Sequence, residues 1–159
     1  MTEPKPKLIP ACQLFGNMAQ LLEEGYEAEF TVTGNSMWPL LAHGADQVVL
    51  KKQLPKKGDI VLYCPIEGKY LLHRINRIRG GRFRAAGDGN CFHDGSFALN
   101  CVVGTVVRLC RRGKWMDRQS LFLRMWGFWW NLLFPIRPAL LWCLRKLAGW
   151  KRRVKSHDR

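Results

Sequence analysis

The chain has 159 residues and a formal net charge of +14, with 26 Lys and Arg against 12 Asp and Glu. This length allows one domain with its own core plus an appendage, and it excludes two substantial domains. The charge is uneven: residues 1–110 carry 13 basic against 10 acidic residues, a net charge of +3, whereas residues 111–159 carry 13 against 2, a net charge of +11. The basic character therefore belongs to the C-terminal part and not to the body.

The cysteines and the N-terminus are typical of a protein from a reducing compartment. The six cysteines form no C-x-x-C pair and no zinc-ligand spacing, so we expect free thiols, no metal and no other cofactor. The N-terminal residues contain no apolar stretch long enough for a secretory signal, because Glu23 and Glu24 end the best one. We therefore expect the body of the protein to stay in the cytoplasm.

Residues 1–27 are predicted to form an arm and a short helix. The first ten residues carry three prolines and resemble a loose arm. From Ala11 to Glu24 the pattern indicates an amphipathic helix that Gly25 ends. Its apolar residues recur on one helical face: Leu14, Phe15, Met18, Leu21 and Leu22.

Residues 28–112 are predicted to form a compact, mainly antiparallel β domain. Short stretches with β-type composition alternate with turn signals that contain Gly, Pro or Asp. The stretches of strand length are EFTVTG (29–34), QVVLKK (47–52), DIVLYC (59–64), YLLHRINRI (70–78), RFRAAG (82–87) and CVVGTVVRLC (101–110).

Residues 113–159 form a basic tail that is rich in tryptophan, with six of the seven tryptophans of the chain. The longest uninterrupted apolar run, Met125–Ile136, is too short to span a bilayer, which needs about 20 residues. We predict two helices, at 119–134 and 138–150, that lie in the headgroup region of a membrane. The alternative is a helical hairpin packed on the β domain or on a second subunit. Nucleic acid is not the expected partner, because the dense Trp and Leu pattern favours a membrane.

Five boxes between residues 30 and 107 have a recognisable order. They are TGNSMWPLL (33–41), GADQVVL (44–50), PKKGDIVLY (55–63), YLLHRI (70–75) and AAGDGN with CFHDG (85–95). In this order they resemble the boxes of type I signal peptidases and of the related self-cleaving SOS-type repressors. The resemblance implies a mainly β, signal-peptidase-like or LexA-like domain with serine endopeptidase activity.

The resemblance also implies roles for individual residues. Ser36 matches the nucleophile of the S-M-x-P box. His73, followed by Arg74, matches the second catalytic position in the histidine subtype of the family, where other members have lysine. In that subtype a further aspartate lies six residues beyond the aspartate of the G-D-x-N box, which leads from Asp88 to Asp94.

The chemistry of these residue types agrees with the resemblance. A serine hydroxyl needs a base within hydrogen-bond reach, and an imidazole with a pKa of about 6.5 is ready to accept the proton near neutral pH. A carboxylate on the other ring nitrogen orients the base, a role that we assign to Asp94. Asp88 is an alternative orienting acid, and His93 an alternative base. Backbone N–H groups at the Ser36 turn would bind the oxyanion, with Gly34 allowing the turn.

The remaining residues of the boxes are expected to support this site. We assign Asn35, Met37 and Pro39 to the turn and the wall of the substrate cleft, with core packing as the alternative. Asp59 belongs to the supporting residues, together with Arg74 and Asp88.

The predicted function is that of a serine endopeptidase that removes a signal, leader or propeptide. Signal peptidases bind an extended peptide along an exposed strand edge and prefer small side chains before the cut, a form of β-augmentation. The membrane-spanning helix that usually precedes the serine box is missing, so we expect the protein on the cytoplasmic side of the membrane, peripheral or anchored by its C-terminus. An integral membrane protein with an external active site is the alternative. A non-catalytic peptide-binding module and a regulator related to the repressors are the other functions considered, and the oligomeric state stays open.

Overall fold

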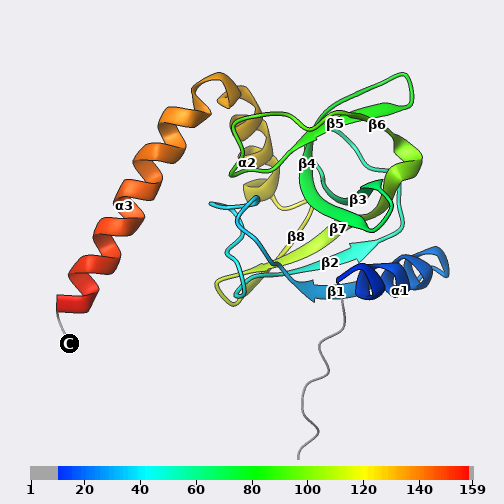
Figure 1. Cartoon of the computed structure of the whole chain (residues 1–159), viewed down its shortest axis with the longest axis horizontal. Coiled ribbons are helices and arrows are strands. Elements are labelled where there is room, and N and C mark those ends of the chain that lie inside the picture. The colour runs from blue at the N-terminus through cyan, green and yellow to red at the C-terminus, as the bar shows by residue number, and fades with distance from the viewer. Residues whose placement is uncertain (1–10, 158–159) are drawn as a thin grey trace, which may run out of the picture.

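The computed structural model describes residues 11–157, and the side chains of residues 14–150. The arm expected at residues 1–10 lies outside this range. The elements are α1 (Ala11–Glu23), β1 (Ala28–Thr31), β2 (Gln47–Lys51), β3 (Ile60–Ile66), β4 (Lys69–Arg79), β5 (Arg82–Ala86), β6 (Ser96–Ala98), the 3-10 turn η1 (Leu99–Cys101), β7 (Val102–Arg111), β8 (Lys114–Asp117), α2 (Leu121–Leu132), the 3-10 turn η2 (Phe134–Ile136) and α3 (Arg137–His157). Figure 1 shows the strands as one strongly curved body, with α1 beside β1 and α3 leading away from it.

The strands form one antiparallel sheet of eight strands in the order β1-β2-β7-β3-β4-β5-β6, with β8 also paired to β7. The prediction of a mainly antiparallel β protein with a short N-terminal helix and C-terminal helices is therefore confirmed. Hairpin turns with glycine at positive φ connect several strands. Gly80 and Gly81 form the tight turn between β4 and β5. Their φ angles of 56° and 69° are positive, a conformation that glycine adopts without steric cost.

Two strands, β6 and β8, were not predicted. They are three and four residues long and contain no β-branched residue, so the sequence pattern has no strand signal there. Strand β8 pairs with β7 from Lys114 to Asp117, so the sheet extends beyond the boundary expected at residue 112. The chain reaches α2 directly from this last strand.

The curved sheet encloses two apolar clusters. The larger one lies among α1, β1, β2, β7 and α2, and includes the fully buried Leu22, Leu50 and Leu109. In α1, Met18 and Leu22 are buried and Phe15 packs on this cluster, whereas Leu14 and Leu21, expected on the same face, are exposed. The smaller cluster lies on the other face of β3 and β4, and its members are Val61, Tyr63, Ile75, Phe83, Ala85 and Val102.

The alternation of side chains along β4 places neighbouring residues on opposite faces of the sheet. His73 and Ile75 lie on the side of the smaller cluster, with Tyr63. Arg74, between them, lies on the opposite side, under α2. This alternation separates the histidine and the arginine of the YLLHRI box into two environments.

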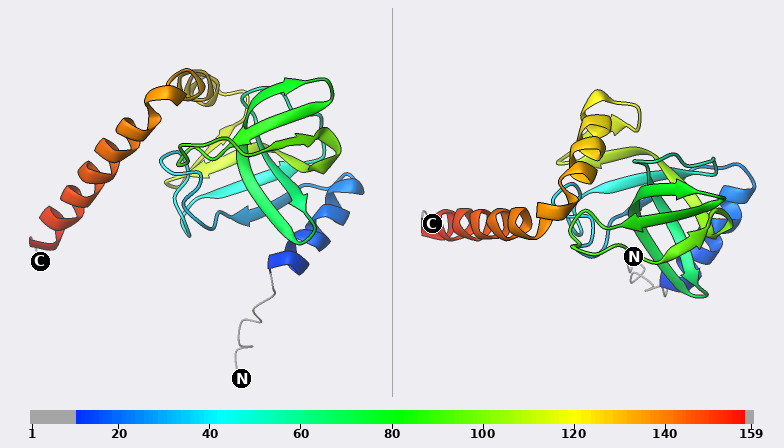
Figure 2. Two further views of the ribbon diagram at one scale, coloured as in Figure 1. Left: turned by 45° about the horizontal axis from the view of Figure 1, so that its top comes forward. Right: turned by 90° about the horizontal axis from the view of Figure 1, so that it is seen from above.

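The C-terminal segment consists of two helices with a break, close to the predicted positions. The Ser120 side chain caps α2 by accepting a hydrogen bond from the amide of Leu123, and Pro135 lies in the break. Leu123, Gly127 and Trp130 face the sheet. The first turns of α3 touch the body and the rest runs away from it, as the two views of Figure 2 show. Within residues 11–157 no helix is long and apolar enough to cross a membrane.

Candidate active site

His73 and Asp94 form a close pair at the edge of the smaller cluster. His73, only 4% exposed, has its Nδ1 2.6 Å from Oδ2 of Asp94. Burial by itself would raise the pKa of Asp94, but hydrogen bonds from His73 and Tyr63 outweigh burial and lower this pKa. An ionised Asp94 accepts a hydrogen bond from the Nδ1–H group, and in that tautomer Nε2 carries the free lone pair of the imidazole.

Tyr63 is a third member of this group that the sequence analysis did not assign. Its hydroxyl donates a hydrogen bond of 2.6 Å to the same Oδ2 of Asp94. Burial, followed by the hydrogen bond and the charge of Asp94, raises the pKa of Tyr63, so the phenol stays protonated and remains a donor. Val61 pairs with His73, and Tyr63 lies two residues further on the same face of β3. A tyrosine at that position in the PKKGDIVLY box is therefore the signal that could have identified it.

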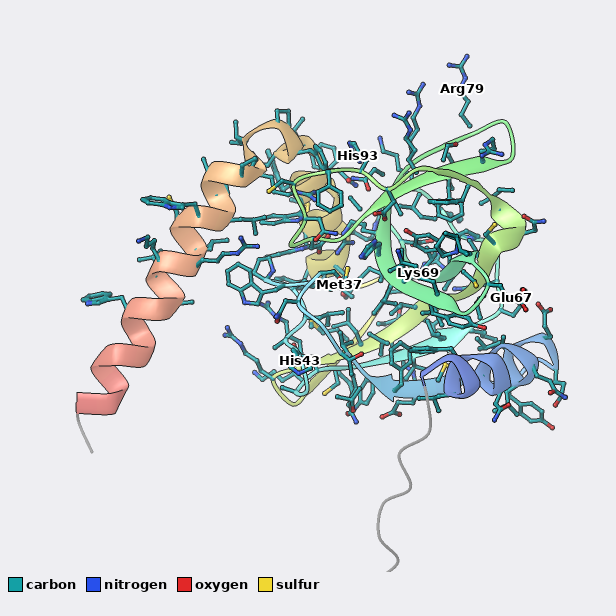
Figure 3. The ribbon with its side chains drawn as sticks, viewed as in Figure 1. Met37, His43, Glu67, Lys69, Arg79 and His93 are labelled. Carbon is teal, nitrogen blue, oxygen red and sulfur yellow. The ribbon has the colours of Figure 1, made fainter. Side chains whose placement is uncertain are left out.

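The loop between β5 and β6 separates the two neighbours His93 and Asp94. The amide of Asp94 donates to the carbonyl of Ala85, which holds the carboxylate towards His73. The His93 ring instead stacks on Phe134, with ring centroids 3.8 Å apart, and lies on the α2 side of the molecule (Figure 3). Burial, with the charges of Arg137 and Arg84, lowers the pKa of His93. Asp94 is thus the residue in position to orient His73, and His93 belongs to another contact.

Ser36 is half-buried on the turn that follows β1. Its carbonyl oxygen accepts a hydrogen bond of 2.7 Å from the amide of Gly89. A Cβ on Gly89 would come within 2.7 Å of the Asn35 carbonyl and 2.9 Å of the Trp38 carbonyl, and a Cβ on Gly87 would collide with the carbonyl of Ser36. The glycines of the AAGDGN box are therefore required because this loop packs backbone to backbone against the serine turn.

The register of β4 and β5 relates this contact to the histidine. Arg74 pairs with Ala86, so His73 and Gly87 are the next residues along the two chain segments. Gly87 in turn touches the backbone of Ser36. The fold thus brings Ser36, His73 and Asp94 to one region. Among the described residues no hydrogen bond joins the Ser36 hydroxyl to His73.

The amides of the serine turn differ in their availability. Gly34, with a φ of 86°, has its amide engaged with Nδ1 of the exposed His43, at 2.8 Å. The amide of Ser36 has no hydrogen-bond acceptor within the described part of the chain. Of these two amides, only that of Ser36 is therefore available to donate a hydrogen bond to a further group, and Gly34 contributes its backbone conformation.

The other residues of the turn contribute either to the core or through backbone carbonyls. Met37 is 1% exposed and belongs to the larger apolar cluster, so its packing role is the one that the structure assigns. Asn35 and Pro39 contribute backbone: the Asn35 carbonyl accepts from the amide of Trp38, and the Pro39 carbonyl accepts from Arg111.

Asp88 and Arg74 form a buried ion pair on the opposite side of β4. Nε and Nη2 of Arg74 lie 2.9 and 2.8 Å from the two carboxylate oxygens of Asp88, and both residues are almost fully buried. Trp126 donates to Oδ2 of Asp88 and Trp130 to its backbone carbonyl. These donors engage both carboxylate oxygens of Asp88, and among the described residues no hydrogen bond joins Asp88 to His73.

Asp59 stabilises a turn and lies outside the His73 group. It accepts a hydrogen bond from the amide of Lys56 and pairs with Arg118 at 3.0 Å. Burial raises the pKa of Asp59, and the Lys56 hydrogen bond and Arg118 offset part of this effect.

The start of the C-terminal segment clamps the AAGDGN loop. Arg137, 1% exposed, donates from Nη1 to the carbonyls of Gly87 (3.1 Å) and Asn90 (3.2 Å) and from Nη2 to the carbonyl of Trp130 (2.8 Å). Arg145 reaches the carbonyl of Gly89. Membrane association of this segment stays a prediction, and its alternative was packing on the β domain; α2 and the first turns of α3 do pack on the β body. Basic residues beside aromatic ones, as in FPIRP, are compatible with either environment, so composition alone could not find this clamp.

Within the described residues no three His, Cys, Asp or Glu side chains are grouped so that they could hold a metal ion. No protein-family model matches this sequence, and no curated protein matches it.

Proposed function

We propose that the protein is a serine endopeptidase of the signal-peptidase-like type, with Ser36 as nucleophile, His73 as base and Asp94 as orienting carboxylate. The observation that carries the proposal is the 2.6 Å contact between Nδ1 of His73 and Oδ2 of Asp94. This contact uses Nδ1 and leaves Nε2 of His73 available to a serine hydroxyl. The Ser36 turn lies against the loop that leads to Asp94. The order of the five boxes supports the same assignment.

The proposed reaction follows from these positions. The Ser36 hydroxyl attacks the carbonyl carbon of the scissile peptide bond, and Nε2 of His73 takes its proton. The oxyanion receives a hydrogen bond from the Ser36 amide. When the tetrahedral intermediate collapses, the imidazolium gives its proton to the leaving amine, and Ser36 carries the acyl group. Water, deprotonated by His73, then releases the acyl group and restores the serine.

Asp94 and Tyr63 support the charge change at His73. The imidazolium that forms lies against an ionised carboxylate, which stabilises the positive charge and keeps the ring in one orientation. Tyr63 occupies the same carboxylate oxygen and so keeps Asp94 in place.

The proposed substrate is an extended peptide. Strand β1 is at one end of the sheet order and leads directly into the Ser36 turn. A chain that pairs with this edge runs towards the nucleophile, which is the β-augmentation mode. We propose a leader, signal or propeptide with small side chains before the cut. We also propose membrane association on the cytoplasmic side through the exposed face of the C-terminal helices.

The test is to co-express the chain with the small open reading frames encoded beside it and to compare peptide masses. Wild type is expected to produce a mass loss that corresponds to one cut, and Ser36→Ala and His73→Ala are expected to abolish it. Ser96→Ala, a matched change at an exposed serine, is the control that keeps the cut. Equal masses with wild type and Ser36→Ala would contradict the peptidase proposal for those substrates, and an uncut peptide that copurifies would favour a binding module.

A further inference from the structure

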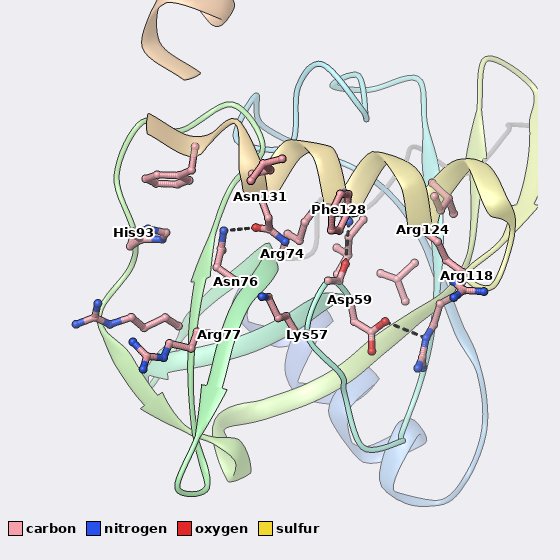
Figure 4. Close-up of a pocket in the computed structure, with 18 of the residues that line it drawn as sticks. Lys57, Asp59, Arg74, Asn76, Arg77, His93, Arg118, Arg124, Phe128 and Asn131 are labelled. Atoms are coloured by element: carbon pink, nitrogen blue, oxygen red, sulfur yellow. Dashed lines mark hydrogen bonds and ion pairs between the residues drawn. The ribbon is translucent and has the colours of Figure 1, made fainter. Parts of the chain in front are cut away.

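A cavity of about 690 Å³ lies between α2 and the sheet. Its lining includes Arg74 on β4 and Gly127 on α2, but none of Ser36, His73 and Asp94. It is therefore separate from the proposed catalytic centre. Figure 4 shows side chains from the sheet and from α2 facing each other across this space.

Positive charge is in excess around the cavity. Two of its arginines have carboxylate partners, Arg74 with Asp88 and Arg118 with Asp59. Four further cations line it and have no carboxylate partner among the described residues: Lys57, Arg77, Arg84 and Arg124. The lining contains one carboxylate, Asp59, which Arg118 already occupies. An anion in this space would meet several cations at once.

Arg77 and Arg84 make this excess more specific. They are directly opposite each other in the pairing of β4 and β5, so their side chains lie on the same face. Like charges in such a position destabilise a sheet unless an anion lies between them. Among the described residues no carboxylate lies between Arg77 and Arg84, and both residues line the cavity.

The rim of the cavity on the α2 side is apolar and exposed. Phe128 (62% exposed) and Leu132 (58%) both line the cavity and face solvent. They continue an exposed stripe along α2 with Leu121 (74%) and Met125 (47%), at a spacing that keeps the four residues on one face of the helix. A cation cluster that meets such a stripe fits a ligand with an anionic head and apolar chains.

We propose that this cavity binds the phosphate group of an anionic phospholipid, with the acyl chains along the stripe Leu121, Met125, Phe128 and Leu132. The phosphate lies between Arg77 and Arg84 and within reach of Lys57 and Arg124. Such a phospholipid would be the membrane component to which the protein binds, so this inference rests on the membrane association proposed above. It does not depend on the peptidase chemistry. Membrane binding through this site would fix α2, which holds Asp88 and the loop beside Ser36.

The experiment measures cosedimentation of the full chain with vesicles. We expect binding to vesicles of phosphatidylcholine with phosphatidylglycerol and much weaker binding to phosphatidylcholine alone. The double variant Arg77→Gln and Arg84→Gln is expected to weaken binding about 10- to 30-fold, the effect of two cations near an anionic surface. The matched control is Arg79→Gln with Arg82→Gln. It removes the same charge from the same hairpin, outside the cavity, where Arg79 points away from the body (Figure 3).

Further variants and ligands distinguish a specific phospholipid site from diffuse charge attraction and from a soluble phosphate ligand. Phe128→Ser is expected to weaken binding to the anionic vesicles, and thermal unfolding of each variant shows that it is folded. Ser36→Ala is expected to bind like wild type, so a failed peptidase test leaves this result intact. Equal loss in the two arginine pairs would overturn the proposal, since the attraction would then be diffuse. Binding of inorganic phosphate or glycerol phosphate without binding of vesicles would overturn it too, by showing a soluble ligand.

Discussion

The amide of Gly89 donates a hydrogen bond of 2.7 Å to the carbonyl oxygen of Ser36. This bond joins the turn that carries the serine to the loop that leads to Asp94. Arg137 holds the same loop from the other side through the carbonyls of Gly87 and Asn90. The geometry of the serine turn thus depends on a contact with the loop, and the loop depends on the C-terminal segment.

Gly89→Ala is expected to disturb the serine turn. The added Cβ would lie 2.7 Å from the Asn35 carbonyl and 2.9 Å from that of Trp38, so the backbone must shift. Displacement of a nucleophile by about 1 Å costs roughly 100-fold in rate, and we expect kcat/KM for peptide cleavage to fall by that order. Gly149→Ala, at a helical position with nothing within 4 Å of the added Cβ, is the control and should leave kcat/KM unchanged. Wild-type activity of Gly89→Ala would contradict the close contact.

Asp94→Asn is expected to reduce kcat by about 10³- to 10⁴-fold, because the amide no longer selects the productive tautomer of His73. The change keeps the shape of the side chain, so binding of the peptide should change less than kcat. Tyr63→Phe removes only one donor to the carboxylate and should cost about 10-fold or less. Steady-state cleavage kinetics measure both. A larger loss in Tyr63→Phe than in Asp94→Asn would reverse the assigned roles.

The stability of the protein is expected to fall in acid partly through Asp94. Burial raises the pKa of this carboxyl, but the hydrogen bonds from His73 and Tyr63 lower it by a larger amount. The pKa of Asp94 in the folded protein is therefore below the ordinary value of about 3.9. Ionised Asp94 therefore stabilises the fold above about pH 4, and this contribution disappears as pH falls through the folded pKa. Urea unfolding at a series of pH values should show a larger acid loss for wild type than for Asp94→Asn. Parallel curves for the two proteins would exclude Asp94 as a source.

Arg137→Ala is expected to lower the free energy of unfolding by about 3 kcal/mol, since it leaves buried carbonyls without donors and removes a guanidinium packed 4.4 Å from the Phe134 ring centroid. Hydrogen exchange in residues 87–91 should accelerate as the loop loses its anchor. Arg124→Ala, an exposed arginine on α2, should stay within about 0.5 kcal/mol of wild type. An equal effect of the two changes would show that Arg137 does not anchor the loop.

Much of the fold could be predicted because its signals are local. The six predicted strands have β-type composition and clear turns, and the N-terminal helix ends at Glu23, two residues before Gly25, which has a φ of 92°. Strands β6 and β8 were missed because they contain no β-branched residue and form only by pairing with β5 and β7. The pairing energy that makes them strands comes from residues far along the chain.

For the candidate site, the sequence by itself determined the types of residue and their order: a serine turn, a histidine in a strand, two aspartates six residues apart, and a C-terminal segment that is basic and aromatic. Only the tertiary structure decided their partners. It placed Asp94 on His73 and Asp88 on Arg74, because adjacent residues of β4 point to opposite faces and each meets a different part of the loop. It also turned Trp126, Trp130 and Arg137 towards that loop and left Phe128 and Leu132 exposed beside the basic cavity. Both faces of α2 carry large apolar residues, so only packing against the sheet distinguishes the buried face from the exposed one.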